Sequence, residues 1–332
     1  MRAAYITATG APEQITVGEL PTPEPGPDEV LVRIRAASLN PIDTYIRSGT
    51  IPMAQKFPYI PGCDLAGEIT AVGGKVTKFK VGDRVWGTNQ SLFGRQGTFA
   101  EYIAVDPGWL YATPDELTDT DAAAASLVGM TAHLGLFLHG NLKAGEYLFV
   151  NGGTGGVGSM VIQFAKAAGA KVMTTAGTEE KRQLCRDLGA DVVVDYKSPT
   201  LEEEIKAFAE PNGGLDFWWE TQREPTIERS IGHMKKRGRI VVMAGRDAKL
   251  SFTLGPFYVN DLKLIGFAMF NASQAEQQAA ADEMNFWAQQ KKWKALVGKE
   301  FSLDDAAAAH ALQEANTLQK AGTLTGKIVV LP

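Results

Sequence analysis

Three glycines that follow an apolar strand carry the clearest chemical signal in this sequence. Gly153, Gly155 and Gly158 stand in the spacing G-x-G-x-x-G, after the apolar run EYLFVNG and before a long apolar helical stretch. In this context the first glycine makes a tight turn, the second lets backbone approach a pyrophosphate, and the third lets helix pack on strand. The helix N-terminus offers N–H groups to phosphate. The pattern therefore predicts a dinucleotide-binding site.

The end of the next predicted strand, KVMTTAG, indicates which dinucleotide fits. An acidic residue there hydrogen-bonds the ribose 2′-hydroxyl of NAD, but residues 176–178 read Ala-Gly-Thr. A lysine follows within reach of a 2′-phosphate, with a solvated helix lysine as its alternative reading, whereas Glu179 and Glu180 would repel a phosphate if they pointed inward. The missing acid favours NADPH. The residues expected around the 2′-phosphate are Gly177, Thr178, Lys181 and Tyr196.

The predicted elements fall into a β-rich part, a part of alternating strands and helices, and a C-terminal tail. Up to about residue 120, short β-prone runs alternate with Pro- and Gly-rich turns, no helix of useful length is expected, and a small Greek-key-like barrel is the simplest fold. Beyond this part, strands and helices alternate as in the βαβ units of a parallel sheet. The terminal run GKIVVLP is expected to form a strand that returns to the first domain.

Capping residues predict several helix boundaries. Thr178 is the expected N-cap of a helix that Gly189 ends. Ser273 and Glu276 form a capping box at the start of a helix that is expected to stop at Gly298.

Length, composition and charge exclude several classes of protein. At 332 residues the chain is long for one hydrophobic core, so we expect two domains. A net charge of -5 gives no reason to expect nucleic acid or a membrane as partner, and the basic run KKRGR at 235–239 is expected only to end a helix. No apolar stretch approaches the length of a membrane span, and no signal peptide is recognised. Two cysteines make no disulfide framework, which favours a cytoplasmic protein.

The order of the motifs identifies a family resemblance that covers nearly the whole chain. These motifs are NPIDTYIRSG, PGCDLAGEI, VGDRV, AEYIAV, NGGTGGVG, AGTEEK and TGKIVVLP. They resemble the medium-chain dehydrogenase/reductase superfamily, most closely its zinc-less NADPH:quinone reductase branch, the zeta-crystallin-like proteins. The resemblance implies an α/β protein with a GroES-like β-barrel catalytic domain, residues 1–123 and 266–332. It also implies a Rossmann doubly wound parallel-sheet cofactor domain, residues 124–265, and an active cleft between the two.

A thiol beside a carboxylate, Cys63 and Asp64, raises the question of a metal site. Zinc alcohol dehydrogenases of this superfamily place a cysteine where this chain has Asn40, and Gly-His-Glu where it has Gly62-Cys63-Asp64. A catalytic zinc needs about three protein ligands, so Cys63 is left without companions. The structural zinc lobe is missing too, because Cys185 is the only other cysteine. We expect a structural turn and no metal.

The resemblance implies catalytic residues near the nicotinamide. Asn40, Asp43 and Tyr45 would line the cleft, with Tyr59 at its mouth. Quinones accept hydride well, so positioning of the reactants supplies much of the rate. Tyr45 would donate a proton to the developing phenolate or enolate, with water as the alternative donor, and Asn40 would orient the acceptor or the ribose. The alternatives are a cap or turn role for Asp43 and a packing role for Tyr45.

The resemblance also assigns contacts along the cofactor. Gly156 and Val157 are expected against the pyrophosphate, and Lys327 against a phosphate or ribose. The residues expected around the nicotinamide and its ribose are Thr131, Ala244, Gly245, Phe267 and Ala268. Several of these residues, Phe267 above all, have packing as their alternative role.

Three departures from the family pattern bear on the substrate. His133 replaces an aromatic residue and is expected to make the pocket more polar. The segment 89–97 is longer and bulkier than the usual glycine turn, so Phe93 and Arg95 are expected to cap the substrate mouth. The tryptophan pair at 218–219 is expected in the core.

The expected function is zinc-independent, NADPH-dependent transfer of hydride to a quinone or activated enone. An enzymatic alternative is reduction of the double bond of an enoyl thioester or alkenal. An alternative from another class is a moonlighting nucleic-acid-binding protein with a vestigial cofactor site. By resemblance we expect a homodimer that pairs edge strands near DLKLIGF, residues 261–267.

Overall fold

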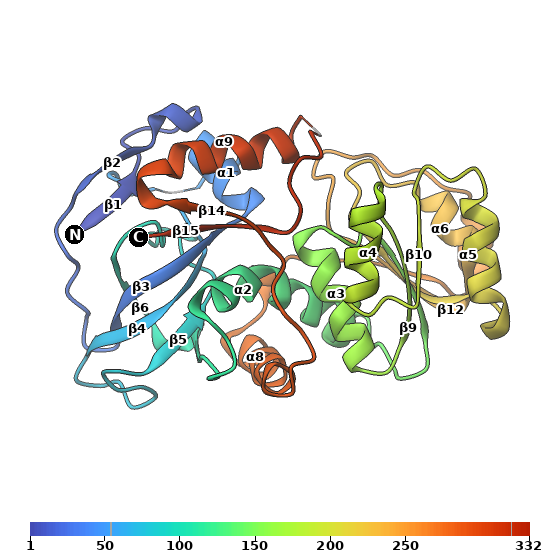
Figure 1. Ribbon diagram of the computed structural model, residues 1–332, viewed down its shortest axis with the longest axis horizontal. Helices are drawn as coiled ribbons and strands as arrows, with labels where there is room; N and C mark the ends of the chain where they lie inside the picture. The colour runs from blue at the N-terminus through green and yellow to red at the C-terminus, as the bar shows by residue number, and fades with distance from the viewer. Residues whose placement is uncertain (54, 320) are drawn as a thin grey trace. The chain divides into compact units, whose positions relative to one another are not determined.

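The computed structural model describes residues 1–53, 55–319 and 321–332. The chain forms two compact units: the first comprises Met1–Val128 and Ser273–Pro332, and the second comprises Gly129–Ala272. Each unit has its own β-sheet (Figure 1). The helix α2 (Asp119–His133) and the π-helix η3 (Leu134–His139) lead the chain from the first unit into the second.

The first unit is built mainly on antiparallel strands. They are β1 (Arg2–Tyr5), β2 (Thr16–Glu19), β3 (Val30–Leu39), β4 (Asp64–Val72), β5 (Arg84–Gly87), β6 (Tyr102–Val105), β7 (Leu110–Ala112), β14 (Val297–Ser302) and β15 (Lys327–Leu331). β1 pairs with β2, and the others form a seven-stranded sheet in the order β14-β15-β3-β4-β5-β7, with β6 beside β3. Along β3, Val32 and Ile34 are buried while Arg33 is exposed, the alternation of a half-buried strand. Ile328 of β15 lies opposite Leu39 of β3, which confirms that the terminal strand returns to the first domain.

Helices of the first unit correct one prediction. They are α1 (Pro41–Ser48), α8 (Gln274–Gln289), α9 (Ala306–Thr317) and the 3-10 helices η1 (Pro12–Gln14), η2 (Pro107–Trp109) and η6 (Leu303–Asp305). The expectation of no helix of useful length before residue 120 was wrong, because α1 forms there. This helix has a cap at each end. Asn40 and Asp43 form a capping box at its start, and Gly49 takes the left-handed conformation at its end.

The boundaries of α8 were predicted only in part. The capping box of Ser273 and Glu276 is present and confirms its start. The predicted stop at Gly298 was wrong, since α8 ends at Gln289. Lys291 takes a left-handed conformation, with φ of 55°, and the N–H of Lys292 donates to the carbonyl of Trp287 at 2.9 Å. A lysine therefore fills the position that glycine usually takes.

The second unit is a parallel, doubly wound sheet, as expected. Its strands are β8 (Tyr147–Asn151), β9 (Lys171–Thr175), β10 (Val192–Val194), β11 (Leu215–Glu220), β12 (Met234–Val242) and β13 (Lys263–Gly266). They pair in the order β10-β9-β8-β11-β12-β13. With β8 as first strand this is the order 3-2-1-4-5-6 of a Rossmann sheet, so the predicted fold class is confirmed.

Helices connect the strands of this sheet, and the core residues on one face are clear. The helices are α3 (Gly156–Ala167), α4 (Glu179–Asp187), α5 (Leu201–Ala209), α6 (Ile227–His233), α7 (Leu254–Val259) and the 3-10 helices η4 (Glu210–Asn212) and η5 (Met269–Asn271). Phe149 and Trp218 pack with residues of α5 and α6 in one cluster. Trp219, the next residue of the strand, packs against Phe267, and a Cβ on Gly135 would overlap its ring. Both tryptophans are core residues, as expected.

The basic run at 235–239 does not end a helix, which corrects the prediction. α6 stops at His233 and the run lies within β12. Lys235 pairs with Asp216 at 2.5 Å, and Arg239 pairs with Glu146. The run is therefore partly neutralised by acids of the same unit.

One helical stretch contradicts the expectation that none is long and apolar enough to span a membrane. Asp119–His139 passes that test by length and composition, with a mean hydropathy of 1.4, but 78% of the apolar window is buried inside the protein. It is thus a core helix of this chain.

The contact of α9 with α1 buries several polar groups. Arg47 of α1 pairs with Glu314 of α9 and donates to the carbonyl of Gly10. His310 of α9 is wholly buried and meets the ring of Phe99 edge-on, with centroids 5.6 Å apart. Neither ring nitrogen of His310 has a hydrogen-bond partner in the described parts of the chain. Burial, assisted by the charge of Arg47, lowers the pKa of His310 from 6.5 to about 3.

Replacement of His310 by leucine should remove a cause of instability in acid. Because its pKa is lower in the folded state, the unfolded chain binds more protons between about pH 3 and 6.5, so stability falls as the pH falls through that window. We expect the unfolding free energy of His310→Leu, measured in urea, to gain on the wild type by up to about 1.4 kcal/mol per pH unit below 6.5. The control His139→Gln, at an exposed site, should show no such gain. A pH-independent difference for His310→Leu would contradict the prediction.

Candidate functional site

The predicted glycine loop joins β8 to α3 in the second unit. α3 begins after Gly155 without a side-chain cap, so its first amides are available to a ligand or water. A Cβ on Gly158 would overlap the carbonyl oxygen of Gly152, and a Cβ on Gly153 would lie 2.5 Å from Oγ1 of Thr174. At Gly155 the nearest atom would be 3.8 Å away, which leaves this position open. The loop thus combines tight helix-to-strand packing with the accessible backbone that a pyrophosphate needs.

Most other predicted cofactor residues follow the carboxyl ends of the parallel strands. They are Gly156 and Val157 after β8, Gly177 and Thr178 after β9, Tyr196 after β10, Ala244 and Gly245 after β12, and Phe267 and Ala268 after β13. Because parallel strands end at one edge of the sheet, the fold brings these residues to one edge. That edge is where doubly wound sheets bind their ligands.

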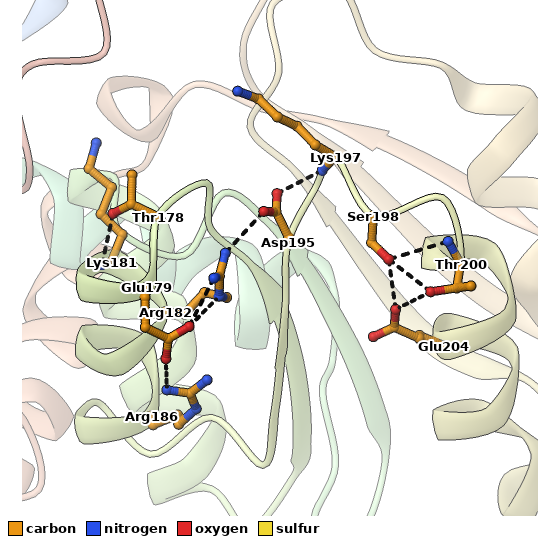
Figure 2. Close-up of polar contacts among 10 residues, drawn as sticks. All are labelled: Thr178, Glu179, Lys181, Arg182, Arg186, Asp195, Lys197, Ser198, Thr200 and Glu204. Atoms are coloured by element: carbon orange, nitrogen blue, oxygen red, sulfur yellow. Dashed lines mark hydrogen bonds and ion pairs between the residues drawn. The ribbon is translucent and has the colours of Figure 1, made fainter.

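The four residues predicted for the 2′-phosphate lie together after β9 and β10. Thr178 is the N-cap of α4, and its hydroxyl accepts a hydrogen bond from the N–H of Lys181 at 3.3 Å (Figure 2). A Cβ on Gly177 would lie 2.6 Å from the ring of Tyr196, so these two residues are in contact. The ammonium of Lys197 lies 5.6 Å from the centre of the same ring. The corner therefore holds two lysines and no acid at residues 176–178.

The acids near this corner are engaged by neighbouring groups. Glu179 contacts both Arg182 and Arg186 at 2.8 Å (Figure 2), and these arginines lower its pKa. Asp195 pairs with Arg182 at 3.1 Å. The carboxylate of Glu180 bonds to its own N–H and to the hydroxyl beside it at the helix start, which lowers its pKa. Of these three acids, Glu180 is the one whose described hydrogen bonds do not involve an arginine.

Phe267 has packing partners, as its alternative role implied. Its ring stacks on His139, with centroids 4.7 Å apart, and meets Trp219 edge-on at 6.3 Å. The expected backbone contact from Phe267 to a carboxamide stays a prediction. Thr131 of α2 is buried within the same unit, and His133 packs on Phe137 and Phe164, with ring centroids 4.8 and 6.3 Å away.

In the first unit, Asn40 and Asp43 form the start of α1. The N–H of Asn40 donates to Oδ2 of Asp43 at 2.7 Å, so the structure gives Asp43 the cap role that was its alternative. Nδ2 of Asn40 donates to Oδ2 of Asp64 at 2.7 Å, and its Oδ1 accepts from Lys327. Both ends of the Asn40 amide are therefore bonded inside the protein, and the side chain is wholly buried.

Lys327 has hydrogen-bond partners within the first unit. It is the first residue of β15, and its ammonium donates to the carbonyl of Leu39 at 2.7 Å and to Asn40. The residue is buried. These partners are groups of the first unit, and the expected contact with a phosphate or ribose stays a prediction.

The two predicted tyrosines differ in burial. Tyr59 is not at a mouth: it is 2% exposed, and its hydroxyl bonds to the carbonyl and Oγ of Ser91 at 2.6 and 2.7 Å. Burial is the main cause that raises its pKa. Tyr45 is half-buried on α1, with its carbonyl accepting from Ser48 and Ile51. Of the two, Tyr45 is the better placed to meet a ligand.

The groups around Cys63 do not fit a metal ion. Burial raises the pKa of the Cys63 thiol well above its usual value, and Asp43 and Asp64 add to that effect. Burial also raises the pKa of Asp43 to about 7, against hydrogen bonds from Cys63 and Asn40. The ammonium beside Asn40 would repel a cation. No group of three His, Cys, Asp or Glu side chains that suits a metal occurs among the described residues.

The segment 89–97 places an aromatic and a cation together. Phe93 is 64% exposed. The guanidinium of Arg95 lies over the rings of Phe93 and Trp109, 5.8 and 5.4 Å from their centres, and donates to the carbonyl of Asn89. The expected capping of a substrate by these residues stays a prediction.

Comparisons with known proteins agree with both sheets. Residues 26–115 match the alcohol dehydrogenase GroES-like domain, and residues 156–285 match the zinc-binding dehydrogenase family. Human quinone oxidoreductase is 30% identical over 100% of this chain and 98% of its own length. The chain belongs to the medium-chain dehydrogenase/reductase superfamily. A quinone oxidoreductase of Pseudomonas aeruginosa is 32% identical over 98% of each chain. The structure of Escherichia coli quinone oxidoreductase complexed with NADPH covers all of both chains, with a TM-score of 0.85 and 26% identity.

The chain is therefore an oxidoreductase of this superfamily, whose fold binds NAD or NADP. The matched family is named for zinc binding, but the described residues around Cys63 include no group of three side chains that could hold a metal ion. Two polar residues of the site region were missed from the sequence. Lys197 had a signal, its place next to Tyr196. Ser91 had none, because its bond to Tyr59 joins residues 32 positions apart.

Proposed function

We propose that the chain transfers hydride from NADPH to a quinone or an activated enone without a metal ion. The observation that carries the proposal is the open glycine loop before α3, beside a β9 end that lacks an acid. The full-length similarity to quinone oxidoreductases supports the substrate class. A similar structure complexed with NADPH supports the cofactor.

In this proposal the protein binds and orients the reactants. NADPH, when bound, supplies the hydride. The amides at the start of α3 hold the pyrophosphate, and Lys181, Lys197 and Tyr196 surround the 2′-phosphate. Because a quinone accepts hydride readily, orientation and exclusion of water supply the rest of the rate. The proton that completes the reduction comes from Tyr45 or from water.

The two alternatives have unequal support. Reduction of an enoyl thioester or alkenal needs the same cofactor site, so it is tested with the same assay. A nucleic-acid role loses support because the run at 235–239 has Lys235 and Arg239 paired with acids, and the net charge is -5.

Lys181→Ala should weaken NADPH binding about tenfold, a loss of about 1.4 kcal/mol, and leave NADH binding unchanged. The physical reason is the loss of one cation beside the 2′-phosphate, which NADH lacks. Titration of cofactor fluorescence measures both dissociation constants. Lys171→Ala, at the opposite end of β9, is the matched control and should change neither. Equal affinities of the wild type for NADPH and NADH would remove the cofactor assignment.

A panel of ortho- and para-quinones, enones, alkenals and enoyl thioesters with NADPH should separate the substrate classes. We expect oxidation of NADPH with quinones and enones, followed by absorbance at 340 nm, at rates at least tenfold above those with the thioesters. Faster turnover of enoyl thioesters would favour the alternative. No turnover with any acceptor, by a protein that binds NADPH, would reject the proposed reaction.

We also propose that two copies pair through β13, the edge strand of the second unit's sheet. An edge strand offers unpaired backbone groups, and the nearby helix α7 exposes Leu254, Tyr258 and Val259. Sedimentation should show a dimer that Tyr258→Asp with Val259→Asp converts to a monomer. The control Phe286→Asp, at an exposed residue of α8, should leave the dimer intact. A monomeric wild type would contradict this proposal.

A further inference from the structure

Four ionisable side chains meet in the interior of the first unit. Asp43, Cys63, Asp64 and Lys327 are all buried, and they come from α1, the turn before β4, β4 itself and β15. Asn40 connects them, because it bonds to Asp43 through its N–H, to Asp64 through Nδ2 and to Lys327 through Oδ1. Four ionisable side chains are costly to bury together unless their charges are compensated.

This position is where the resemblance places a zinc ligand set in other members of the superfamily. Here the thiol has lost its cysteine and histidine companions, and its raised pKa opposes the thiolate that a metal requires. The described residues offer no alternative set of three ligands. The candidate cation is the ammonium of Lys327: burial lowers the pKa of this lysine, and the charges of Asp64 and Asp43 oppose that fall.

The contacts of Lys327 are those of a fixed counter-ion. Its ammonium donates to the carbonyl of Leu39 at 2.7 Å and to Oδ1 of Asn40, and its charge acts on both Asp64 and Asp43. The Oδ1 atoms of Asp43 and Asp64 have no hydrogen-bond partner among the described residues. The carboxyls therefore rely on charge as well as on hydrogen bonds.

We propose that Lys327 is the resident cation of this site: its ammonium takes the electrostatic place of a metal, neutralises Asp64, and fixes Asn40 at the start of α1. Lys327 is thus a positioning residue that acts through Asn40. The C-terminal strand supplies it, so the last residues of the chain complete the interior of the first unit. The inference does not depend on the proposed substrate.

The charge of Lys327 beside Asp64 predicts a pH dependence of stability that packing alone would not produce. Burial already raises the pKa of Asp64 in the folded chain, and the charge of Lys327 opposes that rise. Without the ammonium, the folded state should hold the proton on Asp64 to still higher pH than the unfolded chain does. Stability then falls as pH rises above about 4. The titratable groups that face Asp64 are Asp43, Cys63 and Lys327, and its other partners are Asn40, Thr88 and the backbone of Leu127.

The test compares Lys327→Met, Asp64→Asn and the double variant by thermal unfolding from pH 5 to pH 8. We expect the Tm deficit of Lys327→Met to grow by about 5 °C or more between these limits. The double variant should lose the part of this growth that is due to Asp64, while the part due to Asp43 remains, and it should be more stable at pH 8 than Lys327→Met alone. The control Lys299→Met, at an exposed lysine of the neighbouring strand β14, should match the wild type throughout.

Three results would overturn the inference. A Tm deficit of Lys327→Met that is the same at every pH, and additive with that of Asp64→Asn, would show packing without a charge role. One zinc ion per chain in the purified wild type, by elemental analysis, would show that a metal holds the site. If Lys327→Met alone does not fold, folding of the double variant supports the charge pairing, and failure of both variants to fold rejects it.

Discussion

The close approach of α3 to the end of β8 is the contact on which the second unit depends. A side chain at residue 158 would overlap the carbonyl of Gly152, so only glycine allows the helix to start there. This approach places the first amides of α3 at the carboxyl edge of the sheet, where the segments that follow the other strands also begin. The packing that fixes the helix on the sheet and the backbone proposed to bind phosphate are therefore the same feature.

In the first unit, buried charged side chains hold the start of α1. β15 pairs with β3, and its first residue, Lys327, donates a hydrogen bond to Asn40, the N-cap of α1. The start of that helix is thus held from three sides, by its own capping box, by Asp64 of β4 and by the last strand. A buried network of this kind adds little net stability but specifies one arrangement, because a partial network would leave a charge unpaired.

Local patterns predicted the second unit well and the first unit only in part. The strand, glycine loop and helix are adjacent in sequence, as are Thr178 and Lys181, so spacing alone reveals them. Asn40 bonds to partners 24 and 287 positions away, and Tyr59 to one 32 positions away. Such distances leave no periodic signal in the sequence. The resemblance therefore placed Asn40 and Tyr59 at a cleft and its mouth, whereas both side chains are buried. The end of α8 at a left-handed lysine was missed for a related reason, since glycine is the usual signal.

An ammonium and a divalent metal differ in what they let a site do. A zinc ion with an open position polarises a substrate oxygen directly, whereas Lys327 directs its described hydrogen bonds to Leu39 and Asn40. An acceptor that needs strong polarisation, such as a simple ketone, would gain nothing from a buried ammonium whose bonds are directed inward. A quinone or enone is already electron-poor, so a site that holds its parts rigidly meets the need of that chemistry. The proposed role of Lys327 as the resident cation and the proposed activated acceptor are thus consistent on physical grounds.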